Sequence, residues 1–341
     1  MIQFFAFKRL RGELLSRDTK GNQFFMKLVA YELAKQSHLG VVQDGFVVDV
    51  AAAYGLTAQG RIADAKVGAA AKVLRKLGRP PDDMIELLEL GERYRQALGV
   101  IAGSARALGK KGPKGLLIPL RAAKLRAPIA HPNKITCIGL NYADHAREGG
   151  AKPPDAPIFF MKSHNTICGP GDPIKLPPNS SKVDYEAEFA VVMGKRGHRI
   201  AESEAYKYIA GYTILNDVSA RDMQFSDHQW FRGKSCDTFA PTGPWIVTAD
   251  EIPNIDNLRI SLTLNGKTLQ DSNTSNLIFK VPFLISYLSQ SVTWEVGDLI
   301  STGTPPGVGV FRKPPVLLKA GDTVSVTVEG IGSLTNSVVG P

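Results

Sequence analysis

The sequence has few cysteines, no long apolar run, no internal repeat and no low-complexity segment. Its three cysteines, Cys137, Cys168 and Cys236, lie far apart and form no CxxC pair, which excludes a disulfide scaffold and a cysteine-based zinc site. We therefore expect a reducing, cytoplasmic setting. No apolar run approaches the length needed to span a bilayer, so we expect no membrane association.

Acidic residues are scarce in the first part of the 341-residue chain and balanced by basic ones in the rest. Residues 1–130 hold about 22 of the 41 Lys and Arg and about 11 of the 32 Asp and Glu, so the net charge of +9 originates there. The basic residues are not interleaved with aromatic ones, as platforms for single-stranded nucleic acid require, and we expect no nucleic-acid partner. An apolar content of 43% is ordinary for a globular protein of one large or two modest domains.

Residues 1–25 begin with a short apolar run and then turn basic, whereas a regular pattern starts at Met26. The apolar run is too short for a secretory signal, and Glu13 and Asp18 argue against a transit peptide. We expect residues 1–25 to be a flexible extension.

Residues 26–128 have the pattern of a small α/β domain. Asp44-Gly45 between two apolar segments predicts a β-hairpin. The pattern predicts helices over Ile62–Leu77 and from Met84 to Ala97, with an exposed linker over Gly103–Gly115.

A strand-like segment from Asp184 to Met193 carries two carboxylates on one face. At period two, Glu186 and Glu188 lie side by side, and the other face is apolar throughout. Burying adjacent like charges is costly, and a hard divalent cation such as Mg²⁺ or Mn²⁺ is a common reason to keep them. From the pattern alone, a solvated strand face explains the pair equally well.

A third carboxylate follows the strand predicted over residues 211–216. If a helical turn begins there, Asp217, Arg221 and Gln224 share one face and extend together from the strand end. The alternative is that Asp217 caps this helix and pairs with Arg221.

His145 and Glu148 follow a buried-type strand, Ile135–Leu140. On a short helix they fall at i and i+3, where the carboxylate would orient the imidazole and raise its basicity, as in a general base. An exposed surface pair is the competing interpretation.

Two further segments carry candidate substrate contacts. Lys234 lies among aromatic residues and glycine and is either a cation for an anionic substrate or an ordinary loop lysine. Residues 302–309 lack the lysine of a phosphate-binding loop, but they could present backbone N–H groups and the Thr304 hydroxyl to a carboxylate. A simple turn cluster is the other interpretation.

Taken as a set, these segments resemble the fumarylacetoacetate hydrolase superfamily. The matching motifs occur in the family's order and are Gly139–Glu148, Glu186-Ala-Glu188, Asn216–Gln224, Gly233–Asp237 and Thr302–Gly309. The resemblance covers roughly residues 130–339. The segment Gly307–Pro315 and the N-terminal domain resemble the two-domain members, the fumarylacetoacetate hydrolase domain-containing proteins.

The resemblance implies a β-rich α+β fold of mixed sheets over residues 129–341, rolled around a metal site, in a homodimer. The metal would be Mg²⁺ or Mn²⁺, whose place Ca²⁺ could take in a crystal. The ligands implied by the resemblance are Glu186, Glu188 and Asp217.

The resemblance also assigns roles to the remaining candidates. Catalytic roles fall to His145, Glu148 and Lys234, with the first two on a lid that closes over substrate. Contacts to substrate oxygens fall to Arg221, Gln224 and Thr304.

We therefore expect a metal-dependent enzyme that acts on a small 2-oxo acid. The intact dyad favours hydrolysis of a C–C bond in an acylpyruvate or fumarylacetoacetate-like substrate through an enolate. An oxaloacetate-type decarboxylase or a dienoate isomerase or hydratase would use the same site. A metal-stabilised binding protein is the non-enzymatic alternative.

Overall fold

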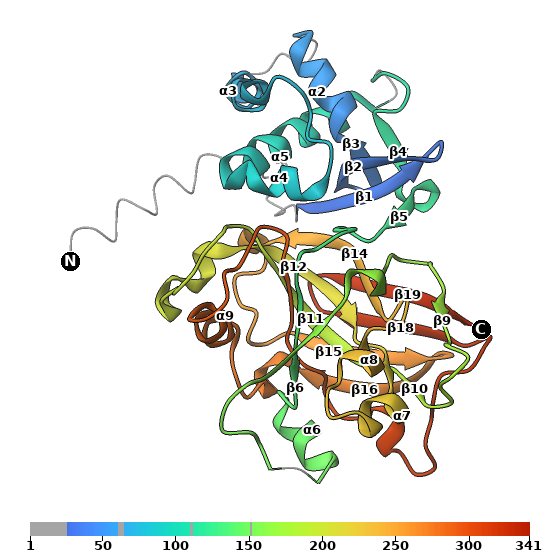
Figure 1. Ribbon diagram of the computed structural model, residues 1–341. Helices are drawn as coiled ribbons and strands as arrows, with labels where there is room; N and C mark the ends of the chain where they lie inside the picture. The colour runs from blue at the N-terminus through green and yellow to red at the C-terminus, as the bar shows by residue number, and fades with distance from the viewer. Residues whose placement is uncertain (1–25, 61–64, 110–111, 151) are drawn as a thin grey trace. The chain divides into compact units, whose positions relative to one another are not determined.

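The computed structural model describes residues 26–60, 65–109, 112–150 and 152–341 (Figure 1). The chain forms two compact units that divide between Lys124 and Leu125. The extension predicted at residues 1–25 lies outside the described residues. Strand β5 (Lys124–Arg126) spans the division.

Unit 1 contains an antiparallel sheet in the order β4-β3-β2-β1. Its strands are β1 (Lys27–Leu33), β2 (Gln36–Gln43), β3 (Phe46–Asp49) and β4 (Leu117–Pro119). The predicted hairpin is confirmed: Asp44 and Gly45 join β2 to β3 with φ of 47° and 77°, as a type I′ turn requires.

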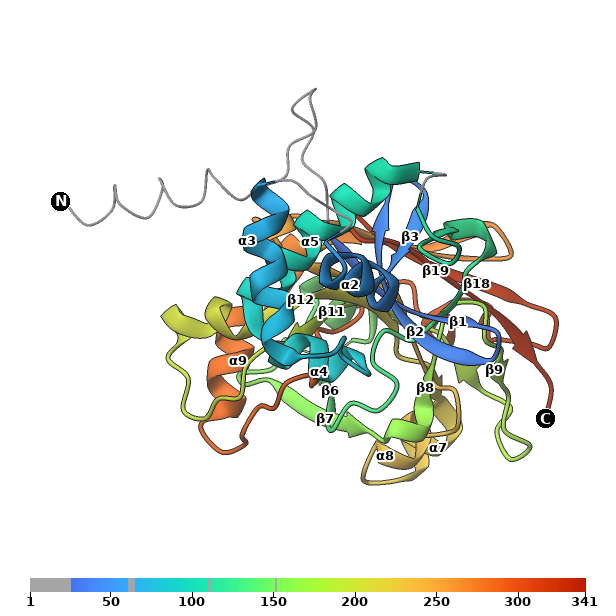
Figure 2. The same cartoon turned by 90° about the horizontal axis from the view of Figure 1, so that it is seen from above.

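Four helices pack beside this sheet (Figure 2). They are α2 (Val50–Ala58), α3 (Ala65–Leu74), α4 (Met84–Glu89) and α5 (Gly91–Leu108). Asp49 ends β3 and begins α2, because its Oδ1 accepts a hydrogen bond of 2.7 Å from Ala52 N. Helix α5 contacts the other three helices and β2, so it is the centre of this unit.

The sequence predictions for α4 and α5 were wrong in two respects. The helix expected over Met84–Ala97 is interrupted at Gly91, whose φ of 81° ends α4 and starts α5. The first part of the linker expected over Gly103–Gly115 is helix, because Ala102 and Ala105 continue the buried stripe of α5, which ends at Leu108. The linker was predicted from glycine and lysine content alone, which does not reveal a buried helical stripe.

Unit 2 is built from two larger sheets and a short ribbon. The main sheet, in the order β14-β12-β11-β17-β6-β7, contains β6 (Ile135–Gly139), β7 (Ile158–Lys162), β11 (Ala187–Met193), β12 (Ile209–Asn216), β14 (Ala240–Thr248) and β17 (Leu299–Ser301). It is mixed, since β17 and β6 are parallel whereas β11 and β12 are antiparallel. Strand β8 (Ile167–Cys168) pairs in parallel with β14.

The second sheet has the order β16-β15-β18-β19-β9. Its strands are β9 (Ile174–Lys175), β15 (Arg259–Leu264), β16 (Lys267–Asn273), β18 (Thr323–Val328) and β19 (Gly332–Val339). The ribbon pairs β10 (Val183–Asp184) with β13 (Ser219–Ala220). This arrangement confirms the predicted β-rich α+β class.

The core of unit 2 lies between the two sheets. The apolar face predicted for the carboxylate-bearing strand is confirmed, because Phe189 and Val191 of β11 pack in one cluster with Leu262 of β15 and Val326 of β18. The opposite face of β11 is buried as well. Both carboxylates therefore lie inside the protein, and the alternative of a solvated strand face is wrong.

Unit 2 has four α-helices among its described residues, namely α6 (Ala143–Glu148), α7 (Arg221–Ser226), α8 (Phe231–Lys234) and α9 (Val281–Ser289). The helical turn considered directly after Asn216 does not form. Instead Ser219 and Ala220 pair with β10, and α7 begins at Arg221. Asp217 therefore does not cap a helix.

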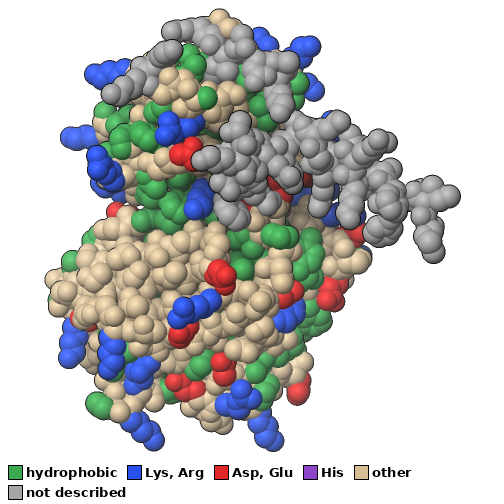
Figure 3. Space-filling model, turned by 180° about the vertical axis from the view of Figure 1, so that it is seen from behind, with side chains coloured by type: hydrophobic (Ala, Val, Ile, Leu, Met, Phe, Trp, Pro, Cys, Tyr) green, Lys and Arg blue, Asp and Glu red, His purple; other side chains and the backbone are tan. Residues whose placement is uncertain are grey.

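The surface carries both charge signs. Figure 3 shows Lys and Arg side chains mixed with Asp and Glu on the visible face of unit 2. Within the described ranges, none of the helices combines the length and the apolar composition that crossing a membrane would demand.

Candidate active site

Three carboxylates meet at the ends of two paired strands. Glu186 directly precedes β11, Glu188 lies within it, and Asp217 directly follows β12. The antiparallel register pairs Ala187 with Asn216, so both strand ends meet. One oxygen from each carboxylate lies within 4.8 Å of the others, and all three side chains are buried. The structure thus gathers the three residues that we predicted to bind metal.

Two buried lysines contact this triad. Lys234, at the end of α8, lies 2.8 Å from Glu186 Oε2 and 2.7 Å from Asp217 Oδ2. Lys162, at the end of β7, lies 2.5 Å from Asp217 Oδ1 and also donates to Val218 O at 3.0 Å. Burial alone would lower the pKa of Lys234, but the charges of Asp217 and Glu186 outweigh it and raise the pKa. Lys234 is therefore held as an ammonium ion.

The guanidinium of Arg221 joins the triad to a fourth carboxylate. Its Nε donates to Asp184 Oδ2 at 2.9 Å, and its Nη2 donates to Glu186 Oε1 at 2.6 Å. Its Nη1 donates to Gln224 Oε1 at 2.9 Å. Arg221 therefore makes three contacts with protein side chains, one of which orients Glu186, and it does not pair with Asp217, contrary to the alternative drawn from the sequence.

Glu188 differs from its two neighbours because it accepts only neutral donors. Ser301 Oγ and Gly303 N donate to its Oε2 at 2.5 and 2.9 Å. In the described part of the chain no ammonium or guanidinium lies within ion-pair distance of it. Burial, then the charges of Asp217 and Glu186, raise the pKa of Glu188 well above its usual range.

The excess of negative charge in this cluster favours the binding of a divalent cation. The buried cluster contains four carboxylates, Asp184 included, but three cations, so one negative charge has no partner and its burial is costly. Three carboxylates within 4.8 Å of one another supply the oxygen donors that Mg²⁺ and Mn²⁺ prefer. The donor set therefore fits the predicted metal.

His145 and Glu148 lie on α6, at the spacing expected from the sequence. His145 Nδ1 is 3.2 Å from Glu148 Oε2, and His145 is only 6% exposed, so the alternative of an exposed surface pair is wrong. Burial would raise the pKa of Glu148, but hydrogen bonds from His145 and Gly307 N lower it. Glu148 thus orients the imidazole, whose Nε2 stays available as a base when Nδ1 carries the proton.

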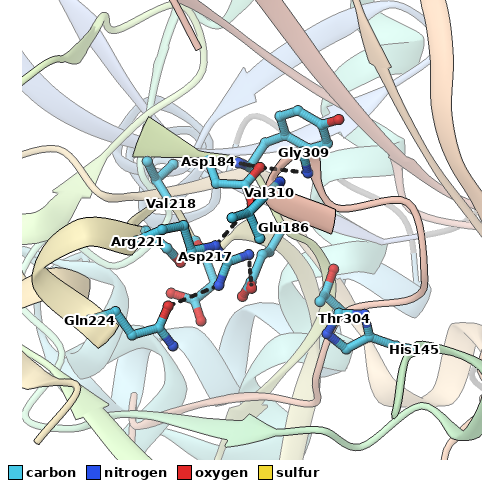
Figure 4. Close-up of polar contacts among 12 residues, drawn as sticks. His145, Asp184, Glu186, Asp217, Val218, Arg221, Gln224, Thr304, Gly309 and Val310 are labelled. Atoms are coloured by element: carbon cyan, nitrogen blue, oxygen red, sulfur yellow. Dashed lines mark hydrogen bonds and ion pairs between the residues drawn. The ribbon is translucent and has the colours of Figure 1, made fainter. Parts of the chain in front are cut away.

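Thr304 and Gln224 are oriented as donors by their neighbours. Gln270 Nε2 donates to Thr304 Oγ1 at 2.9 Å, which leaves the hydroxyl hydrogen for another acceptor. The amide oxygen of Gln224 accepts from Arg221, so its NH₂ group is directed elsewhere. In the view of Figure 4, Glu186 is drawn between Thr304 and Gln224.

A family model described as fumarylacetoacetate (FAA) hydrolase C-terminal matches residues 134–339, which include the triad and the dyad. The chain belongs to the fumarylacetoacetate hydrolase family. This confirms the resemblance drawn from the motifs.

Individual relatives agree with this membership. The chain is 47% identical over 260 residues to the Rattus norvegicus protein named oxaloacetate tautomerase Fahd2a, mitochondrial, covering 76% of this chain and 80% of that one. A solved fumarylacetoacetate hydrolase from Exiguobacterium antarcticum has a TM-score of 0.71 at 31% identity, over 93% of this chain and 100% of that one. A solved 2-hydroxyhepta-2,4-diene-1,7-dioate isomerase from Mycobacterium marinum has a TM-score of 0.66 at 32% identity, over 92% and 98%.

These comparisons confirm the fold of the fumarylacetoacetate hydrolase family and support an enzyme of that family that acts on small acids. The C–C bond hydrolysis expected from the sequence stays a prediction.

The expected cytoplasmic setting is wrong, because the related tautomerases are named as mitochondrial proteins. Unpaired cysteines indicate only a reducing compartment and do not distinguish one such compartment from another. The acidic residues that argued against a transit peptide lie in the part of the sequence outside the described residues.

The glycine-rich loop after β17 binds carboxylates of the protein itself. Its backbone N–H groups donate to Glu188 from Gly303 and to Glu148 from Gly307, at 2.9 Å each. Gly309 N and Val310 N donate to Asp184 at 2.7 and 3.1 Å. We expected these N–H groups to face a substrate carboxylate; these four instead hold three groups of the family's site in place.

Sequence reasoning missed several residues of this site. Lys162 is the charged last residue of an otherwise apolar strand, and this unusual position could have indicated a buried functional lysine. Asp184 lies two residues before Glu186 in the same acidic segment, so the sequence alone could have indicated it as a residue of this site. Gln270 had no local signal, because its contacts with Ala187 and Thr304 cross between distant segments.

We expect Glu188→Gln to weaken divalent-metal binding by at least about tenfold without destabilising the metal-free protein. The substitution removes a ligand charge and also removes repulsion within the triad. Thermal unfolding with increasing Mg²⁺ or Mn²⁺ measures this, since a bound ion raises the unfolding temperature. Asp271→Asn, at an exposed carboxylate, is the matched control. An undiminished metal response in Glu188→Gln would refute the assignment.

We expect Lys162→Met to lower the free energy of unfolding by about 3–5 kcal/mol, because it leaves Asp217 buried without one of its cations. Arg259→Met removes the exposed partner of Asp271 and should cost less than about 1 kcal/mol. Urea unfolding of both metal-free variants gives the comparison. Equal losses of unfolding free energy in the two variants would show that the buried Lys162–Asp217 pair contributes no more to stability than the exposed Arg259–Asp271 pair.

Proposed function

We propose that the protein catalyses proton transfer at the carbon next to the 2-oxo group of oxaloacetate, interconverting its keto and enol forms. The observation that carries this proposal is the pairing of buried His145 with the more exposed Glu148 on the same site as the carboxylate triad and Lys234. The substrate follows from the 47% identity to a protein named oxaloacetate tautomerase. The names of these relatives also support a mitochondrial setting.

The triad and Lys234 would act on the 2-oxo group. A divalent cation held by Glu186, Glu188 and Asp217 would supply Lewis-acid stabilisation of the negative charge that develops on the 2-oxo oxygen. Lys234 has three N–H donors, two of which point to Glu186 and Asp217. We assign its third donor to the same developing charge, where a buried donor is effective.

His145 would act as the base. Its Nε2 takes a proton from the carbon next to the 2-oxo group, and the released electron pair forms the C–C double bond of the enolate. Glu148 stabilises the imidazolium that results. Return of the proton to the oxygen completes the enol, and return to the carbon restores the keto form, so the reaction needs no co-reactant.

Neutral donors would bind the substrate's carboxylates. The Thr304 hydroxyl and the Gln224 amide are each held with a hydrogen pointing away from their protein partners. Arg221 supports this arrangement indirectly, since its contacts are with protein atoms. The homodimer and the absence of nucleic-acid and membrane partners stay predictions.

C–C hydrolysis of an acylpyruvate is the second candidate, because the same dyad could activate water and a solved fumarylacetoacetate hydrolase shares the fold. Decarboxylation and dienoate isomerisation would also pass through an enolate at this site. A binding protein without catalysis is less well supported, because it would not need a buried base oriented by a carboxylate.

We expect the wild-type protein to accelerate the keto–enol interconversion of oxaloacetate and His145→Ala to slow it by about 100-fold or more, since the base is lost. The enol's ultraviolet absorbance gives the rate, and Arg259→Met should retain the wild-type rate. Pyruvate release from oxaloacetate and from an acylpyruvate is measured in the same samples. Pyruvate release from the acylpyruvate without accelerated tautomerisation would overturn the proposal in favour of hydrolysis.

A further inference from the structure

Arg312 lies just outside the carboxylate cluster, after the short 3₁₀ helix η8 (Gly309–Phe311). Its Nε donates to Gly307 O at 3.0 Å, and its Nη2 donates to Leu269 O on β16. The guanidinium thus ties the glycine-rich loop to a strand of the second sheet. Sequence motifs gave this residue no role, and none of its contacts is with the triad.

Gly307 is held on both sides by this arrangement. Its carbonyl oxygen accepts from Arg312 and, at 3.3 Å, from Tyr185 Oη, whereas its N–H donates to both Glu148 oxygens at 2.9 and 3.0 Å. Its φ is 104°, and a Cβ here would lie 2.1 Å from Leu269 O. Only glycine allows this close approach, which aims the N–H at Glu148.

The same segment contacts the rest of α6. The ring of Phe311 lies 6.1 Å from that of His145, centroid to centroid. Phe311 also borders Gly149, where a Cβ would lie 3.3 Å from its ring. Gly307 and Phe311 therefore hold the carboxylate, the imidazole and the end of the helix together. The positive charge of Arg312 further favours the ionised form of Glu148.

We propose that Arg312 is a positioning residue for the dyad: it fixes Gly307, whose N–H holds Glu148 in the orientation that makes His145 a base. This inference rests on the proposed function in that it takes His145 to be the base. Arg312 acts through Glu148 and does not touch the substrate. Its loss should therefore reduce kcat and leave both KM and metal affinity close to their wild-type values.

A double-mutant cycle tests this dependence. Arg312→Met should lower kcat for oxaloacetate tautomerisation by about 10- to 100-fold, as expected for a hydrogen bond made by a charged group. Arg312→Lys keeps the charge and should recover part of the loss. In a Glu148→Gln background, Arg312→Met should have almost no further effect, because the two residues act in series. If the two substitutions lower kcat in the double variant by the product of their separate effects, Arg312 has a general structural role and the proposal is overturned.

Amide hydrogen exchange separates this inference from the proposed function. Arg312→Met should accelerate exchange at Gly307 and across α6, with Arg259→Met as the matched control. If wild-type protein turns over neither oxaloacetate nor an acylpyruvate, the proposed function fails, and the exchange cycle with Glu148→Gln still tests Arg312. Unchanged exchange in Arg312→Met would overturn the positioning role whatever the reaction is. Calorimetric titration with Mn²⁺ should give the same affinity for wild type and Arg312→Met.

Discussion

The burial of like charges is the constraint on which unit 2 depends. Four carboxylates and three cations share one cluster that is largely closed to water, and each ion costs several kcal/mol to bury unless it is paired. The members are Asp184, Glu186, Glu188, Asp217, Lys162, Arg221 and Lys234. Each of the cations contacts at least one carboxylate at 2.9 Å or less, and the unbalanced charge falls on Glu188. The same imbalance that makes the cluster costly without a further cation makes its donor set fit a divalent one.

The glycine-rich loop joins this cluster to the His145–Glu148 dyad. Its backbone N–H groups donate hydrogen bonds to three carboxylates. These belong to Glu188 of the triad, to Asp184, which pairs with Arg221, and to Glu148 of the dyad. Backbone donors carry no net charge, so they orient carboxylates without replacing the cation that the triad needs. One short segment therefore sets the positions of groups that come from two distant parts of the sequence, the segment of Asp184 and Glu188 and the segment of Glu148. A loop of this kind is a structural support for the site as well as a possible contact for substrate.

Local sequence patterns predicted the parts of this site that depend on local geometry. The alternation from Glu186 to Met193 predicted a strand with two carboxylates on one face, and the spacing of His145 and Glu148 predicted that they lie within reach of each other on a helix. Neither pattern by itself decided between a buried site and a solvated surface. The pairing of Asp217 with Lys162 was not visible, because 55 residues separate the two and only the sheet brings them together. The partners of Arg221 were missed for the same reason: a helical spacing was read where β13 forms instead. Long-range strand pairing, which no single segment encodes, decided these contacts.

The surroundings of His145 bear on the choice between the two candidate reactions. Tautomerisation and hydrolysis both move electrons toward the same 2-oxo oxygen, so the triad and Lys234 serve them equally. They differ in the proton that the base removes, which comes from carbon in one reaction and from water in the other. His145 is buried, and the apolar ring of Phe311 lies against it on the side of the loop. An apolar neighbour gives an attacking water no hydrogen-bond partner there, whereas removal of a proton from carbon needs none. The ring of Phe311 beside His145 is thus one observation in support of the proposed proton transfer from the substrate carbon, and hydrolysis stays the second candidate.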